Sequence, residues 1–565
     1  MPLPDSPRSA TASFPAQPSS HSRAASVAVW GLALWLATVG NLPLWQKLLG
    51  LDQSLGQRGV LLAALGLMVW GGTAALLSLL HWPRLYRLLA TALVVVTAFN
   101  SYFMWQFKAV IDSTMMANVL HTDANEVRDL MSWQLVACVL LIVGPALWWI
   151  WRQPMGQRSA WQHVSRNAVG ALVGIALAVV AALAGYQGLS SLMRNHKDVR
   201  FMINPLNSVY GSGVLLVQQL PRQVQALKTV GEDAQLGASY AAQARGPLLL
   251  LVVGETARAQ NWQLNGYPRA TTPQLAEWQA QGGLVNFSQA TSCGTNTQVS
   301  VPCMFSPLTR EEGGNKPAHE ENLLDVLQRA GLAVLWLENQ SGCKGVCARV
   351  PYVDTRILQL PKLCGDAECA DLVMLDGLDA RIEALDPARR AKGVVVVMHQ
   401  MGSHGPAYFR RRPLDQRPFQ PECKSATLSD CPREQLINAY DNTLVQTDAF
   451  LDGALRWLKA RADQATNDTG LIYMSDHGES LGENGLYLHG LPYAFAPVQQ
   501  THIPMVSWLS PGLQTRSRVV IDCLRKRSAE PVSHDNLFHS VLGLMDVTTQ
   551  VYSPALDAFA PCTAK

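Results

Sequence analysis

Pro247-Leu-Leu-Leu-Leu-Val-Val-Gly-Glu255 is a short run of large apolar residues that ends in a carboxylate. A continuous apolar run of this length, without polar alternation, is typical of a strand buried on both faces of a parallel sheet. Four more runs of this kind follow along the chain, at residues 333–337, 393–398, 471–474 and 503–508. Helical patterns at residues 320–330 and 435–461 lie between some of them. The pattern predicts a soluble α/β domain over residues 246–565, with a largely parallel sheet covered by helices on both faces.

Polar side chains directly follow three of the predicted strands. These residues are Glu255 after the first run, His399 and His404 after the run at 393–398, and Asp476 and His477 after the run at 471–474. Each one alone has an ordinary explanation, since a carboxylate at a strand end more often caps the following helix. The carboxyl ends of neighbouring parallel strands, however, meet at one edge of the sheet, where ligands bind. Together these side chains predict a metal site with oxygen and nitrogen ligands, for which Zn²⁺ is favoured and Mn²⁺ is the alternative.

The segment Thr291-Ser-Cys-Gly-Thr-Asn-Thr297 is a candidate nucleophile loop. The hydroxyls of Thr295 and Thr297 lie between Cys293 and Cys303, and a disulfide between these cysteines would close a tight loop around them. A hydroxyl is a poor nucleophile at neutral pH unless a base or a metal ion activates it. A metal ion at the neighbouring strand ends would do so. Without that cluster, a Ser/Thr-rich capping loop is the preferred interpretation.

The composition of the whole chain is that of a membrane protein with a large soluble part. Of the 565 residues, 48% are hydrophobic and only 15% are charged, and the longest apolar stretches lie in the first half. A formal net charge of +3 excludes a strongly basic nucleic-acid binder, so we expect no nucleic-acid partner.

Five stretches in the first half have no charged residue over a length that can cross a bilayer. They are residues 24–46, 60–83, 88–107, 130–151 and 167–193. A helix crosses the hydrocarbon core, about 30 Å thick, in about 20 residues, and the buried helices of soluble proteins usually have shorter apolar runs. We therefore predict a five-helix transmembrane domain over residues 24–193. A disordered, cytoplasmic segment rich in Pro and Ser precedes it at residues 1–23.

The basic residues of the connecting loops predict the orientation of these helices. With a cytoplasmic N-terminus, the inside carries Arg8, Arg23, Arg84, Arg87, Arg152, Arg158 and Arg166. The outside carries the smaller set of Lys47, Arg58, Lys108 and Arg128. Because basic residues favour the cytoplasmic side, five crossings place everything after residue 193 on the outer face. Residues 194–245 then form a linker, and we expect its amphipathic piece at residues 214–230 to lie on the membrane surface.

The cysteines support an external location of the second half. Cys138 lies within a hydrophobic run, and the other ten of the eleven cysteines follow residue 245. An even number in an oxidising compartment indicates disulfides, and the paired CxxC-type knuckles of a zinc ribbon are absent from the sequence. Close spacing favours the pairs Cys293–Cys303, Cys343–Cys347, Cys364–Cys369 and Cys423–Cys431, which leaves Cys523–Cys562 by elimination.

Five motifs make the chain similar to a known family. They are residues 254–258 (Gly-Glu-Thr-Ala-Arg), 293–306 (Cys-Gly-Thr-Asn-Thr to Ser-Val-Pro-Cys-Met-Phe-Ser), 343–347 (Cys-Lys-Gly-Val-Cys), 399–406 (His-Gln-Met-Gly-Ser-His-Gly-Pro) and 475–490 (Ser-Asp-His-Gly-Glu-Ser-Leu-Gly-Glu-Asn-Gly to His-Gly). They closely resemble the bacterial lipid A phosphoethanolamine transferases, which include the mobile colistin-resistance enzymes, and the resemblance covers nearly the whole chain. It implies an α/β/α sandwich of the alkaline phosphatase-like type after five transmembrane helices.

The resemblance also implies roles for individual residues. Thr297 corresponds to the nucleophile that accepts the phosphoryl group. The ligands of the catalytic zinc correspond to Glu255, Thr297, Asp476 and His477. The substrate-phosphate and second-metal residues correspond to Lys344, His404 and His489. The donor-lipid contacts, in the loop after the third helix, correspond to Asn118, Thr122 and Glu126. One position departs from the family pattern: Gln340 stands where a phosphate-contacting Asn is expected. This difference concerns the binding of the headgroup and not the class of reaction.

The implied reaction has two steps. Phosphatidylethanolamine first donates phosphoethanolamine to Thr297 and releases diacylglycerol, and the group then passes to a phosphate of lipid A. One tightly bound Zn²⁺ is implied, with room for a second, weaker ion. The implied location is the bacterial inner membrane, with the catalytic domain in the periplasm, and we expect a monomer. The lower negative charge of the lipopolysaccharide would imply resistance to polymyxin and colistin.

Other functions remain open from the sequence. A related membrane phosphotransferase or hydrolase would act on core sugars, periplasmic glucans or a glycerol-phosphate polymer instead of lipid A. A sulfatase is disfavoured because the chain has no Cys/Ser-x-Pro-x-Arg motif. A sensor or scaffold that kept the fold without catalysis is disfavoured by the intact nucleophile and ligand set. The motifs predict phosphoryl transfer, whereas the choice of acceptor depends on loops that the sequence does not place.

Overall fold

The computed structural model describes residues 20–564 except 51–54, 84, 110, 112–114, 117–126, 129, 154–158, 220–226, 243–244, 315–319, 359, 366–367 and 412–416. Arg8, Arg84 and Arg158 of the charge count lie outside these residues. The chain divides into two compact units. We call Met1–Tyr102 with Ala137–Leu206 the helical unit, and Phe103–Val136 with Asn207–Lys565 the α/β unit.

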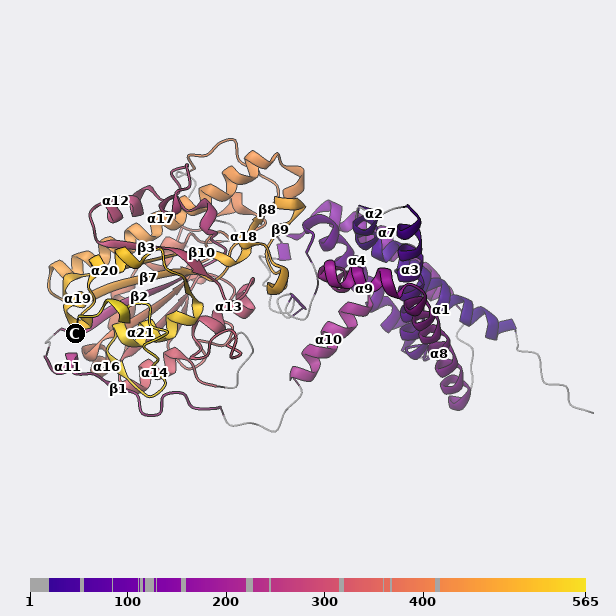
Figure 1. The fold of residues 1–565 in the computed structure, drawn as a ribbon, viewed down its shortest axis with the longest axis horizontal. Helices are drawn as coiled ribbons and strands as arrows, with labels where there is room; N and C mark the ends of the chain where they lie inside the picture. The colour runs from indigo at the N-terminus through magenta and orange to yellow at the C-terminus, as the bar shows by residue number, and fades with distance from the viewer. Residues whose placement is uncertain are drawn as a thin grey trace, which may run out of the picture. The chain divides into compact units, whose positions relative to one another are not determined.

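Helices, most of them long and apolar, form the helical unit and are drawn indigo to magenta in Figure 1. They are α1 (Ser20–Thr38), α2 (Leu42–Leu49), α3 (Leu55–Leu79), α4 (Tyr86–Phe107), α7 (Trp133–Arg152), α8 (Ala160–Ala184) and α9 (Tyr186–Asn195). Five spans are long and apolar enough to cross a membrane, namely Val27–Leu49, Arg58–Leu79, Tyr86–Phe107, Trp133–Arg152 and Ala160–Ala184. They coincide with the five predicted runs. Because α1 already begins at Ser20, residues 20–23 are helical and not disordered as predicted.

Glycine allows α3 and α8 to pack closely. A Cβ atom on Gly71 would lie 2.6 Å from the carbonyl oxygen of Gly174, and a Cβ atom on Gly174 would lie 2.6 Å from that of Gly71. Gly170 and Gly174 have the G-x-x-x-G spacing with which membrane helices approach one another. The predicted run at residues 167–193 is divided between α8 and α9, which meet at Gly185.

The segment that follows the membrane spans differs from its prediction. α10 covers Leu206–Gln219, whereas the amphipathic piece was predicted at residues 214–230. Residues 227–230 are not helical. Lys228 pairs instead in a β-bridge with Glu320, and Val230 is buried in the core of the α/β unit. Burial of Val230 against the sheet therefore overrides the helical pattern at this end.

An eight-stranded sheet forms the centre of the α/β unit, in the order β11-β3-β10-β7-β2-β6-β4-β5. Its strands are β2 (Pro247–Gly254), β3 (Leu284–Thr291), β4 (Ala333–Glu338), β5 (Tyr352–Asp354), β6 (Val394–His399), β7 (Asp468–Ser475), β10 (His502–Leu509) and β11 (Val532–Ser533). All neighbours pair in parallel except β10, which is antiparallel to both β3 and β7. The largely parallel sheet is the predicted one, and it contains all five predicted strands. Two short antiparallel pairs lie outside it, β1 (Gln235–Leu236) with β12 (Val547–Thr548) and β8 (Ser480–Leu481) with β9 (Tyr487–Leu488).

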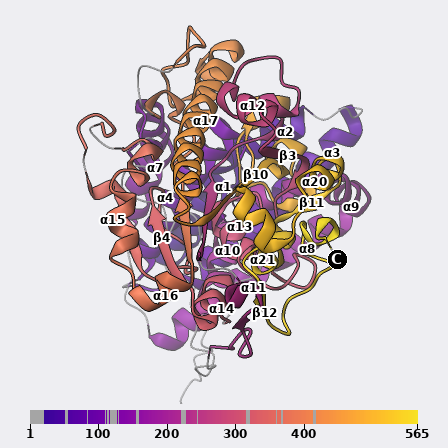
Figure 2. The same cartoon turned by 90° about the vertical axis from the view of Figure 1, so that its left-hand side faces the viewer.

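Helices cover both faces of this sheet (Figures 1 and 2). They are α11 (Ser239–Ala242), α12 (Pro273–Ala280), α13 (Thr297–Met304), α14 (Leu323–Ala330), α15 (Leu378–Glu383), α16 (Pro387–Lys392), α17 (Arg433–Asp463), α18 (Val498–Thr501), α19 (Pro511–Ser517), α20 (Ile521–Arg527) and α21 (Leu537–Leu544). Side chains of β2 alternate between two cores: Leu249 and Leu251 pack with α14 and α21, and Leu248 and Leu250 pack with α12 and α17. Both faces of β2 are therefore buried, which explains its unbroken apolar run.

Five disulfides lie in the α/β unit, and they join the pairs predicted from spacing. They are Cys293–Cys303, Cys343–Cys347, Cys364–Cys369, Cys423–Cys431 and Cys523–Cys562. Cys138, in α7, is a free thiol. Short bridges of this kind mainly hold local loops, whereas Cys523–Cys562 joins α20 to the C-terminal segment.

Removing the Cys523–Cys562 disulfide should destabilise the α/β unit more than removing Cys364–Cys369. The first closes a sequence separation of 39 and the second a separation of only 5. The stabilisation grows with the length of the closed loop, which gives about 4 kcal/mol against about 2 kcal/mol. Thermal unfolding of the two double Cys→Ser variants in detergent measures this difference. Equal melting temperatures, or the reverse order, would contradict the loop-length argument.

Candidate active site

The carboxyl ends of β2 and β7 bring the predicted metal ligands together. The two strands are parallel neighbours, and their register pairs Gly254 with Ser475. Glu255 and Asp476 therefore emerge side by side, and the Asp476 N–H donates to the Gly254 carbonyl at 2.8 Å. Ligand atoms of Glu255, Asp476 and His477 all lie within 4.8 Å of one another, and all three residues are buried.

Unsatisfied polar atoms in this cluster fit a bound cation. Asp476 Oδ2 and His477 Nε2 are buried and have no hydrogen-bond partner among the described residues. His477 Nε2 lies 3.4 Å from both Asp476 Oδ2 and Glu255 Oε1. Buried polar groups without partners cost stability, and a metal ion between them would remove that cost. Two carboxylates, one imidazole and a hydroxyl form a donor set that suits tetrahedral Zn²⁺.

The electrostatics of the cluster also favour a positive charge. Burial lowers the pKa of His477, but the charge of Asp476 and the contact with Glu255 outweigh it and raise this pKa to about 10. Burial raises the pKa of Glu255, yet the close contact with His477 and the charge of that imidazole bring it well below its usual range. The carboxylates thus stabilise a cation at this point, whether a proton on His477 or a metal ion.

Thr297 reaches the cluster from the first turn of α13. Its Oγ1 donates a hydrogen bond to Glu255 Oε2 at 3.2 Å, and both side chains are buried. Asn296 caps the helix, because its side-chain oxygen accepts from the Val299 N–H at 3.1 Å. The positive end of the helix dipole therefore lies at Thr297, where it would stabilise an alkoxide.

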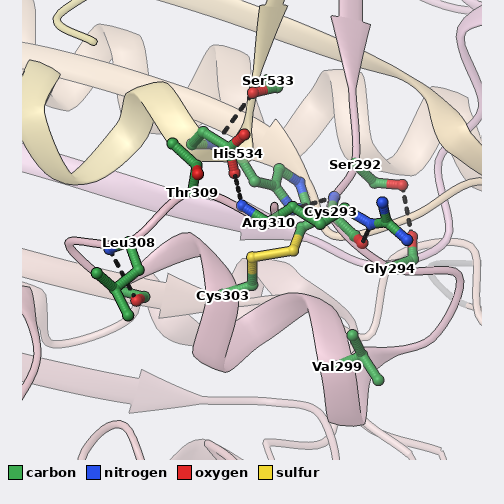
Figure 3. Close-up of a disulfide and its surroundings, with 12 residues drawn as sticks. Ser292, Cys293, Gly294, Val299, Cys303, Leu308, Thr309, Arg310, Ser533 and His534 are labelled. Atoms are coloured by element: carbon green, nitrogen blue, oxygen red, sulfur yellow. Dashed lines mark hydrogen bonds between the residues drawn. A yellow bond between two sulfur atoms is a disulfide. The ribbon is translucent and has the colours of Figure 1, made fainter. Parts of the chain in front are cut away.

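The loop that carries Thr297 is held from two sides (Figure 3). The Cys293–Cys303 disulfide joins its start to α13. Desolvation lowers the pKa of His534 to about 4, so this imidazole is neutral. Its Nδ1 accepts from the Cys293 N–H at 3.1 Å, and its Nε2 lies 2.9 Å from the Ser475 carbonyl, to which it donates. His534 therefore links the nucleophile loop to the end of β7, a role that the sequence analysis did not find.

Thr295, the second hydroxyl of the loop, has a different partner. Its Oγ1 donates to the Leu491 carbonyl at 2.6 Å, and its own carbonyl accepts from the Gly490 N–H at 2.8 Å. These two bonds join the nucleophile loop to the segment that carries His489. Thr295 is therefore a structural residue, and Thr297 is the hydroxyl that faces the carboxylates.

Two further predicted histidines lie next to this cluster. The ring of His489 is 4.3 Å from that of His477 and 5.6 Å from that of His404, measured between centroids. Desolvation lowers the pKa of both His404 and His489 to about 3, so both are neutral imidazoles near pH 7. Glu479 Oε1 lies 3.3 Å from His489 Nδ1, and the Tyr408 hydroxyl donates to Glu479 Oε2 at 2.9 Å.

His399, which the sequence analysis included among the candidate metal ligands, is not part of the group of Glu255, Asp476 and His477 and forms a buried pair with Glu338 instead. Its Nδ1 lies 3.0 Å from Glu338 Oε1 at the end of β4, and its Nε2 lies 4.0 Å from Glu255 Oε2. Burial lowers the pKa of His399, but the charge of Glu338 outweighs it and raises this pKa. The pair directs an imidazole N–H towards Glu255 from the neighbouring strands.

Asp371 holds the backbone between His399 and His404, and no sequence signal had marked it. Its carboxylate accepts from the N–H groups of Met401 at 2.8 Å and Gly402 at 3.0 Å, and from Asn339 Nδ2 at 2.8 Å. The Cys364–Cys369 disulfide precedes it in the chain. Asp371 thus acts on the site through the loop that carries His404.

A large opening lies beside α13, the helix that begins with Thr297. Lys344 lines this opening, and Gln340 directly precedes Ser341, which also lines it. The opening has a volume of about 760 Å³ and is lined by Gln298 of α13 and by residues 341–345 among others. Lys344 Nζ donates to Ser341 Oγ at 2.9 Å, and the disulfide Cys343–Cys347 closes its loop. Gln340 is buried, and its Oε1 accepts from Ser341 Oγ at 2.6 Å. Asn118, Thr122 and Glu126 lie outside the described residues.

Comparisons with known proteins give matches over both halves of the chain. The family model described as phosphoethanolamine transferase EptA/EptB matches residues 69–220, and the model described as sulfatase matches residues 247–547. The chain is 41% identical over 493 residues to phosphoethanolamine transferase EptA of Escherichia coli K12, covering 86% of this chain and 87% of that protein. It is 34% identical over 541 residues to phosphatidylethanolamine transferase Mcr-1 of Escherichia coli, covering 92% of this chain and 95% of that protein.

One solved structure shares the arrangement along nearly the whole chain. It is the integral membrane protein lipooligosaccharide phosphoethanolamine transferase A (EptA) from Neisseria meningitidis, with a TM-score of 0.88 and 36% sequence identity. The match covers 96% of this chain and 99% of that chain. The similarity therefore includes the membrane helices as well as the α/β unit.

Asp371→Asn should slow the transfer reaction about 10- to 100-fold. This is the usual effect of removing a group that orients a site residue without contacting the substrate itself. An asparagine keeps only one oxygen, so its NH2 group would face the N–H of either Met401 or Gly402, and the loop carrying His404 would lose one of its two backbone contacts. Metal content should stay normal, because Asp371 does not contact Glu255, Asp476 or His477 in the described structure. Transfer rate and bound metal are measured on the same preparation.

The matched control is Asp376→Asn, an exposed carboxylate of the same segment. It should leave the rate unchanged. A rate for Asp371→Asn equal to that of this control would show that the loop is held without the Asp371 carboxylate.

Proposed function

Since this chain belongs to the phosphoethanolamine transferase family, we propose that it transfers phosphoethanolamine from phosphatidylethanolamine to a phosphate group of lipid A. One observation carries the chemistry: the Thr297 hydroxyl donates to Glu255 at 3.2 Å, at a helix N-terminus and beside two further potential metal ligands. The Neisseria meningitidis relative, named for lipooligosaccharide, supports a lipid acceptor.

Four residues would hold Zn²⁺ in this site: Glu255, Thr297, Asp476 and His477. When bound, the ion would lower the pKa of the Thr297 hydroxyl and offset negative charge on the phosphoryl oxygens. The two buried, unpaired atoms of Asp476 and His477 support this assignment. His489, whose ring lies 4.3 Å from that of His477, and His404 beside it are the candidates for holding a second and weaker ion.

In the first step the Thr297 oxygen bonds to the phosphorus of phosphatidylethanolamine. The bond from phosphorus to the diacylglycerol oxygen breaks, and diacylglycerol leaves with the proton that Thr297 loses. Glu255 orients the hydroxyl by accepting its hydrogen bond. In the second step a phosphate oxygen of lipid A bonds to the same phosphorus, the bond from phosphorus to the Thr297 oxygen breaks, and Thr297 takes up the proton that the lipid A phosphate or the solvent supplies.

The neighbouring side chains would handle protons and charge. His404 and His489 are neutral near pH 7, and the negative charge of a bound phosphate group would raise their low pKa and favour the transfer of a proton through either imidazole. The Lys344 cation, on its disulfide-closed loop beside α13, would offset charge on the transferred group. Gln340, Asn118, Thr122 and Glu126 remain predicted contacts of the lipid headgroup.

We place the protein in the bacterial inner membrane as a monomer, with the α/β unit in the periplasm. The arginine distribution over the five spans and the five disulfides support this orientation. Both substrates are lipids whose headgroups lie at that membrane surface. Each transferred group adds an ammonium to a lipid A phosphate, which would weaken binding of cationic polymyxins such as colistin.

A phosphoethanolamine adduct should accumulate on Thr297 when the donor lipid is supplied and the acceptor is withheld. Peptide mass spectrometry of the purified chain locates the adduct. Thr297→Ala should abolish both the adduct and the transfer, because it removes the attacking oxygen. Thr297→Ser should keep part of the activity, since only the methyl group that restricts the rotamer is lost.

Thr295→Ala is the matched control for this experiment. It removes a hydroxyl from the same loop, but one that donates to the Leu491 carbonyl, so the adduct should still form and any change in rate should arise from the loop alone. Inverted configuration at phosphorus with a chiral-phosphate donor would instead indicate a single direct displacement. That result would exclude Thr297 as a covalent carrier.

The acceptor is tested by mass spectrometry of lipid A from cells that express the chain. We expect lipid A with one added phosphoethanolamine, and unmodified lipid A in cells that express Thr297→Ala. Modification of core sugars, periplasmic glucans or a glycerol-phosphate polymer, with lipid A unchanged, would refute lipid A as the acceptor. It would leave the phosphoethanolamine chemistry at Thr297 intact.

A further inference from the structure

Arg310 and Tyr493 form a stacked pair beside the nucleophile loop, and the sequence analysis marked neither of them. The Arg310 Cζ atom lies 3.6 Å from the centroid of the Tyr493 ring, so the cation lies against an aromatic ring. Both side chains are half-buried. Arg310 follows α13, and Tyr493 comes four residues after His489. The pair therefore joins the end of the nucleophile motif to the segment that carries His489.

Each member of this pair also donates a hydrogen bond to the backbone of the nucleophile loop. Arg310 Nε donates to the Cys293 carbonyl at 2.9 Å (Figure 3), and the Tyr493 hydroxyl donates to the Ser292 carbonyl at 3.0 Å. The Asp535 carboxylate accepts from the backbone N–H of Arg310 at 2.9 Å, which fixes the start of the arginine side chain. Two consecutive carbonyls are thus bound by two side chains that contact each other.

The backbone of this loop has no free carbonyl from residue 292 to residue 295 in the described structure. The first two carbonyls bond to the stacked pair. The Gly294 carbonyl accepts from Ser292 Oγ, and the Thr295 carbonyl accepts from the Gly490 N–H at 2.8 Å. Residues 292–297 are all buried, and a buried carbonyl without a partner is costly. Loss of either side chain would therefore favour a shift of the loop.

The position of this loop determines whether the Thr297 hydroxyl can react. Thr297 Oγ1 reaches Glu255 Oε2 at 3.2 Å, and a displacement of about 1 Å at a reacting group can cost about 100-fold in rate. The Cys293–Cys303 disulfide and His534 bind the Sγ atom and the N–H of Cys293. The stacked pair adds the contacts to the carbonyls, on the same two residues from which the chain runs to Thr297.

We propose that Arg310 and Tyr493 act as one unit that positions the Thr297 hydroxyl for attack on the donor phosphorus. This inference rests on the proposed function, because it concerns the same nucleophile. Both are positioning residues, since they act on Thr297 through the backbone of residues 292 and 293. A guanidinium suits this role because its planar group can stack on a ring and donate to a carbonyl at the same time.

The rate of adduct formation on Thr297 tests the proposal, with the full-length chain in detergent, phosphatidylethanolamine as donor and no acceptor. Arg310→Ala should lower the maximal rate about 10- to 100-fold. The half-saturating donor concentration and the bound metal should stay the same, because the proposal gives Arg310 no contact with either. Arg310→Lys keeps a cation and an N–H donor and should recover part of the rate. Tyr493→Phe keeps the ring and should slow the reaction less than Tyr493→Ala.

A double-mutant cycle tests whether the two side chains act as one unit. If they do, Arg310→Ala combined with Tyr493→Ala should slow adduct formation less than the product of the two single effects. Hydrogen exchange of the amides of residues 292–297 gives a readout that does not depend on catalysis. Exchange should become faster in each single variant, because a loop with an unpaired carbonyl opens more often.

Arg461→Ala is the matched control. The Arg461 Cζ atom lies 4.6 Å from the centroid of the Trp457 ring, and Arg461 donates to Asn467, but it lies near the start of β7, at the opposite edge of the sheet from Glu255. This variant should form the adduct at the rate of the unaltered chain and leave the exchange of residues 292–297 unchanged.

Arg310→Ala with the rate and the exchange of this control would overturn the proposal, and so would independent effects in the cycle. A higher half-saturating donor concentration at an unchanged maximal rate would also overturn it, since Arg310 would then bind the donor. Absence of any adduct in the unaltered chain would instead refute the proposed function. In that case the hydrogen exchange of residues 292–297 would still test whether the pair fixes the loop.

Discussion

Parallel pairing of β2 with β7 is the constraint on which the catalytic arrangement depends. Their register aligns Gly254 with Ser475, so Glu255 and Asp476 must leave the sheet together at its carboxyl edge. Two buried carboxylates this close repel each other unless a cation lies between them. The same two carboxylates raise the pKa of His477. The Thr297 hydroxyl lies at this point too, because it donates a hydrogen bond to Glu255. The strands thus determine where the two carboxylates lie, and the loop before α13 supplies the hydroxyl of Thr297.

Most of the fold could be predicted because its signals are local. Unbroken apolar runs mark the five spans and the five central strands, and the comparisons confirm the family and the fold class that the motifs predicted. β3 was missed because Leu284–Thr291 mixes polar and apolar residues, as expected near the edge of a sheet. The antiparallel direction of β10 was not predictable from its run, since direction depends on the connections around it. The helix expected to continue to residue 230 ends earlier, because Val230 is buried in a core that no local pattern reveals.

Only some residues of the candidate site could be predicted from the sequence. Those that directly follow strands could be found from the sequence, because their position relative to the sheet is set by the strand itself. Asp371, Glu479 and His534 could not, because each acts through a partner that is distant in the chain or by holding backbone N–H groups. Their polar side chains look like ordinary loop residues until the fold places them. Such supporting groups restrict the loops of Thr297 and His404 while leaving the reacting atoms to others, which is the usual division between a site and its support.

The two units differ in their content of buried acidic groups. In the α/β unit, carboxylates are buried next to histidines, and a cation makes that burial tolerable. In the helical unit, Asp and Glu are absent from residues 53–102 and 137–197, and the helices pack through apolar side chains and through glycines such as Gly71 and Gly174. Packing alone does not explain the buried carboxylates, since apolar side chains of similar size would fill the same space without cost. Charged groups kept in such places indicate ligands. Burial in the α/β unit therefore concentrates negative charge at the point where we propose that phosphoryl transfer takes place.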